Sequence, residues 1–314
     1  MIKSIVIYYS QSGNTKKMAQ AIHAGISKHG EQCEIARLRD VDPRDLTSYN
    51  LIGLGSPVIH SRELPNVTKF ISSMKSVDGK HAFAFCTHGA IPGYYLARVV
   101  PAMIQKGLTV IGWKDWFCSA YHPVIPKPYF TDGHPDAIDL KEAEDFGKEM
   151  VERSRKISLG ETNLIPTLPK GKEYDERYFP VPDSFSIAGN EFKKWVIRKS
   201  FKVDAEKCKY PRCTHCIDNC PTGAIDFSVS PPVFDKDCDS CFLCEQSCPQ
   251  GAIEFDYYEP LEISHRPLNI AVLQRSVDVF EAKGLFRRLV PNEKIGWDTP
   301  FWKSKKPPRF KIDD

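Results

Sequence analysis

The sequence predicts an α/β protein in two parts: an open parallel sheet with helices on both faces, and then a small cysteine-rich α+β module with a C-terminal extension. Two observations lead to this expectation. Over residues 1–158, apolar runs of strand length alternate with stretches of helical spacing, a pattern typical of doubly wound sheets. Further along, eight of the eleven cysteines lie between Cys208 and Cys248. The 314 residues are enough for two domains and their connections.

The composition is that of an ordinary globular protein, with 41% hydrophobic and 26% charged residues. No run of 18 or more apolar residues exists, so no membrane span is predicted. The N-terminal apolar run is only of strand length and lacks a small-residue cleavage site, so we expect a cytoplasmic protein. Eleven cysteines then favour metal binding over disulfides. Cys33, Cys86 and Cys118 lie outside the cysteine-rich stretch and are expected to be buried thiols.

The charge is unevenly distributed along the chain. Residues 203–260 contain 11 acidic and four basic residues, which gives that segment a charge of −7. Since the whole chain carries +3, the remainder carries +10. The two parts are therefore expected to attract different partners. The basic residues are scattered, so we expect no nucleic-acid binding.

The first strand is expected at Ile2–Tyr9, an apolar and β-branched run. A loop rich in hydroxyl side chains follows, and then a stretch with helical spacing at residues 16–29. A strand, such a loop and a helix N-terminus together form a cradle for an anion, because backbone N–H groups and the positive helix end face the ligand. The loop matches neither G-x-G-x-x-G nor a Walker motif. Its candidate binding residues are Ser10, Gln11, Ser12, Gly13, Asn14 and Thr15.

Two further loops follow predicted strands at residues 51–55 and 81–86, and the second of these loops leads into a helix at residues 94–106. Ligands of open parallel sheets bind outside the carboxyl ends of the strands, where such loops converge. The candidate binding residues there are Ser56, Pro57, Val58, Ile59, His60, Thr87, His88, Gly89, Ala90 and Gly93. For His88 two roles stay open: a hydrogen bond to the ligand, or a cap on its own loop.

Another strand is expected at residues 109–119, followed by a proline-rich excursion at residues 120–135. A closing helix is expected at Asp139–Ile157, with Asp139 as the N-cap. The first domain therefore spans residues 1–158 and is followed by a linker at residues 159–202. The linker contains a short amphipathic piece, Asn190–Lys199, and either docks one domain against the other or is a passive tether.

The cysteine-rich module is expected at residues 203–260, and an extension occupies residues 261–314. Helical spacing in the extension covers Leu268–Leu289. The end is basic and aromatic, which suits either a solvated tail or an arm lying on its own or a neighbouring subunit. A homodimer is therefore one arrangement that we consider.

Two cysteine runs carry the strongest chemical signal. Each ends in Cys-Pro and is followed by a Gly-Ala-Ile signature, and the second has the spacing of bacterial ferredoxins. In that pattern three close thiolates hold one [4Fe–4S] cluster and the fourth reaches the other cluster. The resemblance assigns one cluster to Cys208, Cys213, Cys216 and Cys248, and the other to Cys220, Cys238, Cys241 and Cys244. The alternative is a pair of zinc sites, since paired C-x-x-C also binds zinc.

The loop Ser10-x-Ser12-Gly-Asn14-Thr15 resembles the flavodoxin phosphate loop, which wraps the phosphate of FMN. With the cysteine runs, it makes residues 1–260 similar to the flavodoxin–ferredoxin fusion proteins of anaerobic bacteria and archaea. The resemblance implies a flavodoxin-like five-stranded parallel sheet of order 2-1-3-4-5 and a ferredoxin-like second domain. It also implies FMN and two [4Fe–4S] clusters as cofactors. Ile59 and His60 stand where flavodoxins often have an aromatic residue.

These expected cofactors lead to hypotheses about the function of the protein. An electron-transfer protein would pass electrons between one-electron carriers and FMN, and its partner would be another redox protein. The alternative is a flavin-dependent reductase of a small molecule, with His60, Arg62, His88 and Tyr94 as candidate pocket residues. A flavin-free iron–sulfur sensor is a third class. A flavodiiron protein is disfavoured, because the sequence has no H-x-E-x-D motif.

Overall fold

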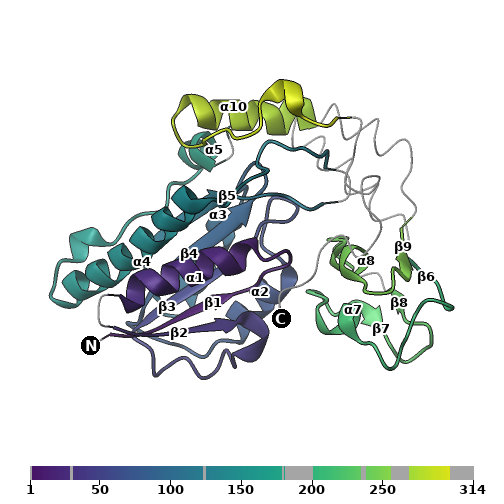
Figure 1. Cartoon of the computed structure of the whole chain (residues 1–314). Coiled ribbons are helices and arrows are strands. Elements are labelled where there is room, and N and C mark those ends of the chain that lie inside the picture. Colours follow the sequence, from purple (N-terminus) through teal and green to yellow (C-terminus); the bar gives the residue numbers. More distant parts are fainter. Residues whose placement is uncertain are drawn as a thin grey trace. The chain divides into compact units, whose positions relative to one another are not determined.

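The computed structural model describes residues 2–28, 31–122, 125–178, 180, 201–234, 238–255 and 269–297. The chain divides into two compact units. Figure 1 shows the helices and strands along the chain. Unit 1 comprises Met1–Ser119 and Gly133–Phe179, and unit 2 comprises Ala120–Asp132 and Pro180–Asp314. In the described part of the chain, no helix is both long and apolar enough to cross a membrane. The domain boundaries expected from the sequence remain predictions.

Unit 1 contains a five-stranded sheet in which every neighbouring pair is parallel. The strand order β2-β1-β3-β4-β5 confirms the predicted order. The strands are β1 Lys3–Tyr8, β2 Gln32–Arg37, β3 Leu51–Pro57, β4 His81–His88 and β5 Thr109–Phe117. The central strands are buried on both faces, which is why their sequences are nearly continuous apolar runs.

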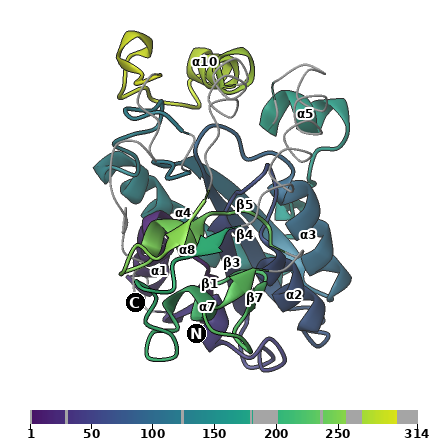
Figure 2. The ribbon, with the colours of Figure 1, turned by 90° about the vertical axis from the view of Figure 1, so that its right-hand side faces the viewer.

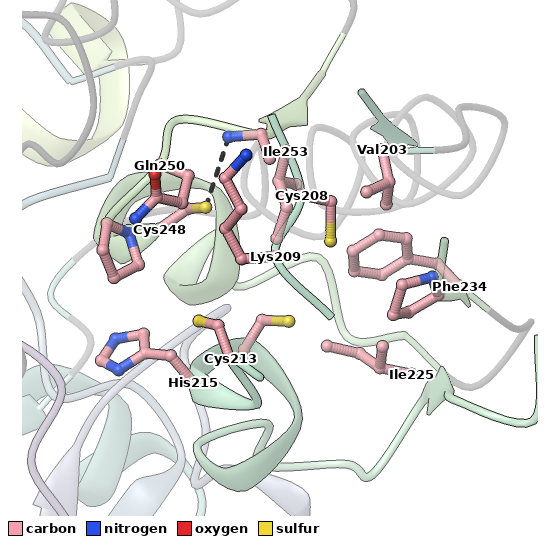
Figure 3. Close-up of a pocket in the computed structure, with 14 residues that line it drawn as sticks. Val203, Cys208, Lys209, Cys213, His215, Ile225, Phe234, Cys248, Gln250 and Ile253 are labelled. Carbon is pink, nitrogen blue, oxygen red and sulfur yellow. Dashed lines mark hydrogen bonds between the residues drawn. The ribbon is translucent and has the colours of Figure 1, made fainter. Parts of the chain in front are cut away.

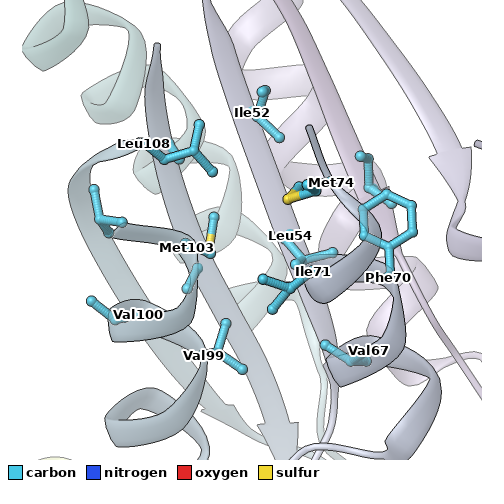
Figure 4. Close-up of a cluster of buried hydrophobic side chains, with 14 of the residues drawn as sticks. Ile52, Leu54, Val67, Phe70, Ile71, Met74, Val99, Val100, Met103 and Leu108 are labelled. Carbon is cyan, nitrogen blue, oxygen red and sulfur yellow. The ribbon is translucent and has the colours of Figure 1, made fainter. Parts of the chain in front are cut away.

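Helices cover both faces of this sheet, as Figure 2 shows. The helices of unit 1 are α1 Asn14–Ser27, α2 Pro65–Ser73, α3 Tyr95–Gln105, α4 Ala137–Ser158 and the short α5 Lys172–Tyr178, with 3₁₀ turns at Leu38–Asp40 (η1) and Thr162–Leu164 (η2). Figure 4 shows one core layer, in which Ile52 and Leu54 of β3 lie near Ile71 of α2 and Met103 of α3. Helices α1 and α4 pack with Phe83 and other residues on the opposite face. The two apolar layers fix the sheet and with it the positions of the loops at its carboxyl edge.

The predicted N-cap of α4 was wrong. The helix begins at Ala137, and its N-cap is Asp136, whose carboxylate accepts hydrogen bonds from the backbone N–H groups of Ile138 and Asp139. Asp139 is the third helical residue and in return accepts from the N–H of Asp136 at 2.8 Å. The two carboxylates thus form a reciprocal capping box. Asp139 also bonds to the Nδ1 atom of His134 at 2.6 Å.

Unit 2 is built from short elements. Two antiparallel pairs of two-residue strands are present: β6 Lys202–Val203 with β9 Ile253–Glu254, and β7 Ile225–Asp226 with β8 Val233–Phe234. Among the described residues of this unit, the helices are α7 His215–Asp218, α8 Leu243–Ser247 and α10 Arg275–Ala282. A π-helical turn at Asn269–Gln274 (η3) precedes α10, and a 3₁₀ turn, η4, follows at Asn292–Lys294. Residues 120–132 pack in this unit, since the Pro128 carbonyl accepts from the Gly296 N–H at 2.9 Å.

The predicted helix at Leu268–Leu289 is shorter than expected. The described helix ends at Ala282, and Gly284 then adopts a left-handed conformation with a φ of 69°. Arg288, which had been expected inside the helix, instead folds back and bonds to Asp278 and Glu281. The predicted piece Asn190–Lys199 and the basic end beyond residue 297 lie outside the described residues.

Candidate functional site

Residues 10–15, here called loop 1, connect β1 to α1. Gly13 has a φ of 89° and is the N-cap of α1, with no side-chain cap and no acidic residue in the first turn. The first N–H groups of a helix have no intrahelical partners, so this end is suited to an anion. The Ser10 hydroxyl accepts from the Gly13 N–H at 3.1 Å. The Gln11 side-chain nitrogen is buried and has no hydrogen-bond partner in the described part of the chain.

Two buried side chains attach loop 1 to the neighbouring strand ends. The Thr15 hydroxyl lies 2.8 Å from the Thr87 hydroxyl at the end of β4. The Asn14 amide nitrogen donates to the Ser119 carbonyl, just beyond β5, at 2.9 Å. Asn14 is 7% exposed and Thr15 is 2% exposed, so both contacts are shielded from water. These two hydrogen bonds therefore fix loop 1 against the carboxyl ends of β4 and β5.

Residues 56–62, called loop 2, follow β3. The Val58 N–H donates to the Thr87 carbonyl at 2.8 Å, and Ile59 and Arg62 exchange two backbone hydrogen bonds of 3.1 Å. His60 and Ser61 lie between them with φ values of 50° and 60°. Non-glycine residues rarely adopt this conformation, and two in succession form the tight turn of a two-residue hairpin. Such local strain is often found at ligand sites.

Residues 87–94, called loop 3, contact loop 2 directly. The Tyr94 N–H donates to the Ser61 carbonyl at 2.8 Å. Gly93 has a φ of 57°, and a Cβ atom on it would lie 2.5 Å from the Ser61 carbonyl oxygen, so only glycine fits there. Ala90 is buried and Gly89 is partly exposed. The three predicted loops thus meet at one edge of the sheet.

His88 takes a partner that sequence reasoning missed. Its Nε2 atom lies 3.0 Å from the Asp115 carboxylate on β5, and its ring packs edge-on against Phe117 with centroids 4.5 Å apart. The side chain is 1% exposed, and its Nδ1 atom has no hydrogen-bond partner among the described residues. The sequence does contain a feature that points to Asp115, because a charged residue is unusual inside a predicted buried strand, here residues 109–119.

Glu63 is a second residue that the sequence analysis overlooked. It is 3% exposed and lies immediately after loop 2. Its carboxylate accepts from Arg98 of α3 at 2.8 and 2.9 Å and from the Thr68 hydroxyl at 3.0 Å. A buried carboxylate needs such partners, because its desolvation is costly. This ion pair ties the exit of loop 2 to α2 and α3.

The eight cysteines of unit 2 lie in two neighbourhoods. Cys208, Cys213, Cys216 and Cys248 line one pocket, together with His215, Phe234 and Ile253. Figure 3 shows Cys208, Cys213 and Cys248 around this pocket. Burial raises the pKa of the Cys216 thiol to about 11, and the nearby thiols of Cys248, Cys208 and Cys213 contribute further.

The other four cysteines are neighbours of one another. Burial raises the pKa of Cys241 to about 12, and Cys220 and Cys238 are the nearby thiols that add to the shift. Burial likewise raises the pKa of Cys244, with contributions from Cys241, Cys238 and Cys220 and a smaller one from Cys216. Each neighbourhood contains the cysteines of one predicted ligand set, and the assignment of these sets to two clusters stays a prediction. Among the described residues, no group of three or more His, Cys, Asp or Glu side chains is arranged to hold a metal ion.

The two cysteine runs adopt repeated conformations. Gly223 and Gly251, each three residues after the last cysteine of its run, have φ values of 69° and 57°. Ala224 and Ala252 follow at 1% and 2% exposure, and each leads into a short strand. The left-handed glycine redirects the chain after each Cys-Pro pair. The two cysteine runs therefore resemble each other in backbone conformation as well as in sequence.

Aromatic side chains surround the cysteines. Phe201, Phe242 and Phe255 form a buried cluster with Ile253, against which Cys208, Cys216, Cys238 and Cys244 pack. The Ala252 N–H donates to the Cys248 sulfur at 3.3 Å. In the first run the Ala224 N–H instead bonds to Thr222, whose hydroxyl lies 3.5 Å from the Cys220 sulfur. The sulfur atoms are thus placed among apolar groups and a few hydrogen-bonding groups.

Comparisons with known proteins match about half of this chain. The family model of the flavodoxin domain matches residues 5–95. A flavodoxin of Megasphaera elsdenii is 31% identical over 110 residues, which are 34% of this chain and 80% of that protein. An uncharacterized protein of Methanocaldococcus jannaschii is 25% identical over 156 residues, 48% of this chain and 99% of that protein.

A solved flavodoxin structure from the domain Archaea has 26% identity and a TM-score of 0.39, and the match covers 49% of this chain and 99% of that one. Loops 1, 2 and 3 all lie within the residues that the family model matches. Through this N-terminal part, the chain belongs to the flavodoxin family.

Proposed function

We propose that this chain is an electron-transfer flavo-iron–sulfur protein, with FMN at loops 1, 2 and 3 and two [4Fe–4S] clusters on the eight cysteines of unit 2. When bound, FMN exchanges one or two electrons and each cluster exchanges one, so the protein would connect single-electron carriers with two-electron chemistry. The observation that carries the proposal is the separation of the eight cysteines into two sets of four, in the same chain as a flavodoxin fold.

The residues of loop 1 fit a phosphate group. The N-terminus of α1 has no competing acidic residue or side-chain cap, and Ser10, Ser12 and Thr15 add hydroxyl groups. The buried amide nitrogen of Gln11 is a further donor that lacks a partner among the described residues. Backbone N–H groups and hydroxyls at a helix N-terminus bind phosphate without a lysine or arginine. Loops 2 and 3, which contact each other, would hold the flavin ring.

The residues of unit 2 fit clusters by their chemistry. Four thiols around one pocket would provide the ligands of one [4Fe–4S] cluster, and the second set of four would provide those of another. The buried phenylalanines exclude water, and the N–H of Ala252 is directed at the Cys248 sulfur. Burial and hydrogen bonds to sulfur are the features by which proteins set cluster potentials.

Rapid mixing tests the proposal. The full chain, prepared without oxygen, is mixed with a reduced ferredoxin, and the absorbance of the iron–sulfur and flavin bands is followed. We expect reduction of both bands, with bleaching of the iron–sulfur band coupled to reduction of the flavin. A flavin that stays oxidised while the iron–sulfur band is reduced would contradict electron transfer between the two. The physiological partner is proposed to be such a redox protein.

A second function is favoured by one observation, the buried pair of His88 and Asp115. A histidine held by a carboxylate at the edge of a flavin site is an arrangement suited to proton donation, as in a reductase of small molecules. Turnover assays on reduced protein distinguish the two functions. Electron delivery to protein acceptors alone supports the carrier. Reoxidation by a small molecule at catalytic rates, lost in His88→Gln, would support the reductase.

A further inference from the structure

Helix α5 (Lys172–Tyr178) lies after α4, in the stretch that the sequence predicts as a linker. It nevertheless packs in unit 1, through two tyrosines that are 3% and 4% exposed. The hydroxyl of the second, Tyr178, accepts a hydrogen bond from the indole nitrogen of Trp113 on β5 at 2.9 Å. The ring of the first, Tyr174, packs 4.8 Å from that of Tyr178. Helix α5 is thus fixed to the sheet by Tyr178, and the Tyr174 hydroxyl is left for other contacts.

The Tyr174 hydroxyl makes two hydrogen bonds, one to loop 3 and one to the first turn of helix α3, which follows that loop. It donates to the Gly93 carbonyl at 2.8 Å and accepts from the Ala97 N–H at 3.2 Å. Ala97 lies in the first turn of α3, whose N-cap, Tyr94, forms no side-chain cap bond. First-turn N–H groups need an external partner. Tyr174 therefore caps α3 from a different helix, and the Tyr94 ring stacks parallel to its own at 6.4 Å.

Gly93 is also the residue at which loop 3 meets loop 2. Its left-handed conformation brings it against Ser61, and the Ser61 carbonyl accepts from the next residue, Tyr94. Ser61 is itself left-handed, as is His60. A conformation of this kind persists only where surrounding contacts impose it. A continuous series of contacts thus runs from Tyr174 through Gly93 to the strained turn of loop 2.

We infer that Tyr174 is a positioning residue for the flavin: its hydroxyl holds loops 2 and 3 in the conformation that receives the ring. This inference rests on the proposed binding of FMN at these loops. The segment after α4 thereby takes part in the flavin site, because its Tyr174 hydroxyl bonds to both the Gly93 carbonyl and the Ala97 N–H. Removing only the hydroxyl should loosen the Gly93 peptide and leave the ring packing in place.

The test compares Tyr174→Phe with Tyr178→Phe in the full chain. Both remove one buried hydroxyl from the same helix, but only Tyr174 contacts a flavin loop. We expect the FMN dissociation constant of Tyr174→Phe to rise about tenfold, because the loss of both hydrogen bonds of the hydroxyl loosens the loops that receive the ring. For Tyr178→Phe we expect a change within about twofold. The visible circular dichroism of bound flavin and its midpoint potential should change in Tyr174→Phe alone.

The outcomes separate this inference from the proposed function. If the wild-type chain binds no FMN, the proposed function fails and the inference with it. If the wild-type chain binds FMN and Tyr174→Phe binds it equally well, with the same dichroism and potential, only the inference fails. Equal weakening in both variants would also overturn it, as would loss of folding in FMN-free Tyr174→Phe, because the hydroxyl would then serve the fold and not the flavin loops.

Discussion

The hydroxyl groups of Thr15 and Thr87 lie 2.8 Å apart, although 72 positions separate the two residues in the sequence. Thr15 is the second residue of helix α1, and Thr87 is the last but one residue of strand β4. Both are almost fully buried. This hydrogen bond joins the loop proposed to hold the FMN phosphate to the loop proposed to hold the flavin ring, so the two ends of the site depend on each other.

Thr87→Val should therefore destabilise unit 1. The substitution keeps the shape of the side chain but leaves the Thr15 hydroxyl buried without its partner, which costs about 1–3 kcal/mol. Urea unfolding of Thr15→Val, Thr87→Val and the double variant measures the coupling. The double variant should lose less than the sum of the two single losses. Strict additivity would show that the hydroxyls do not interact.

Asn14→Ala should weaken FMN binding about tenfold, because loop 1 loses its link to the Ser119 carbonyl. Fluorescence titration of the FMN-free protein measures the effect. Gln20→Ala is the matched control, since Gln20 is an exposed residue on the same helix and should leave the affinity unchanged. Full retention of flavin by Asn14→Ala would count against the assignment of the phosphate loop.

Gly93→Ala should disturb the flavin loops more than Gly79→Ala. Both glycines are left-handed, with φ values of 57° and 73°, so both substitutions carry a similar backbone penalty. A methyl group on Gly93 would collide with the Ser61 backbone, whereas one on Gly79 meets nothing within 4 Å. We expect unfolding experiments to show the larger loss for Gly93→Ala and FMN titration to show weaker binding for it alone. Equal behaviour of the two variants would contradict the contact between loops 2 and 3.

Cys216→Ala should remove one cluster and leave the other. Anaerobically prepared protein would then contain about four iron atoms per chain, one [4Fe–4S] cluster, in place of about eight. Cys33→Ser provides the control, because Cys33 lies on β2 in unit 1 and belongs to neither cysteine run. Its iron content should equal that of the wild type. Undiminished iron in Cys216→Ala would remove Cys216 from the proposed ligands.

Glu31 provides a prediction on pH. Burial would raise the pKa of this carboxyl, but hydrogen bonds from Arg155 and from the Ile2 N–H together lower it below its usual value. A lowered pKa contributes stability that is complete above the pKa of the unfolded chain and is lost as the pH falls through the folded value. Glu31→Gln should cost about 1 kcal/mol at neutral pH, since Arg155 is partly exposed. The difference from wild type should vanish in acid, and urea midpoints at several pH values measure it.

The sheet was predictable because its strands are buried on both faces and so differ sharply from the loops that follow them. Ile5, Ile7, Ile52 and Phe83 are almost inaccessible to solvent, and each lies in an apolar run. The loop residues could be named because they stand directly after those runs. Helix α5 could not be predicted in the same way: five of its seven residues, Lys172–Tyr178, are charged, and it is held by two tyrosines whose partners are far away in the sequence.

Other residues of the site were missed because their roles depend on tertiary contacts. Asp115 and Glu63 are single acids whose partners, His88 and Arg98, lie 27 and 35 positions away. The N-cap of α4, in contrast, could have been predicted correctly. Asp136 and Asp139 are both residues typical of a helix N-terminus, and their spacing is that of a capping box. The division of the cysteines into two ligand sets rests on the spacing of a ferredoxin-type run. It stays a prediction.

The most direct test of the central claim is the cofactor content of one sample of the full chain, purified without oxygen. The account predicts about one FMN together with about eight iron and eight sulfide per chain. A colourless protein with stoichiometric zinc, or a sample that contains iron and sulfide but binds no FMN when it is supplied, would contradict the account.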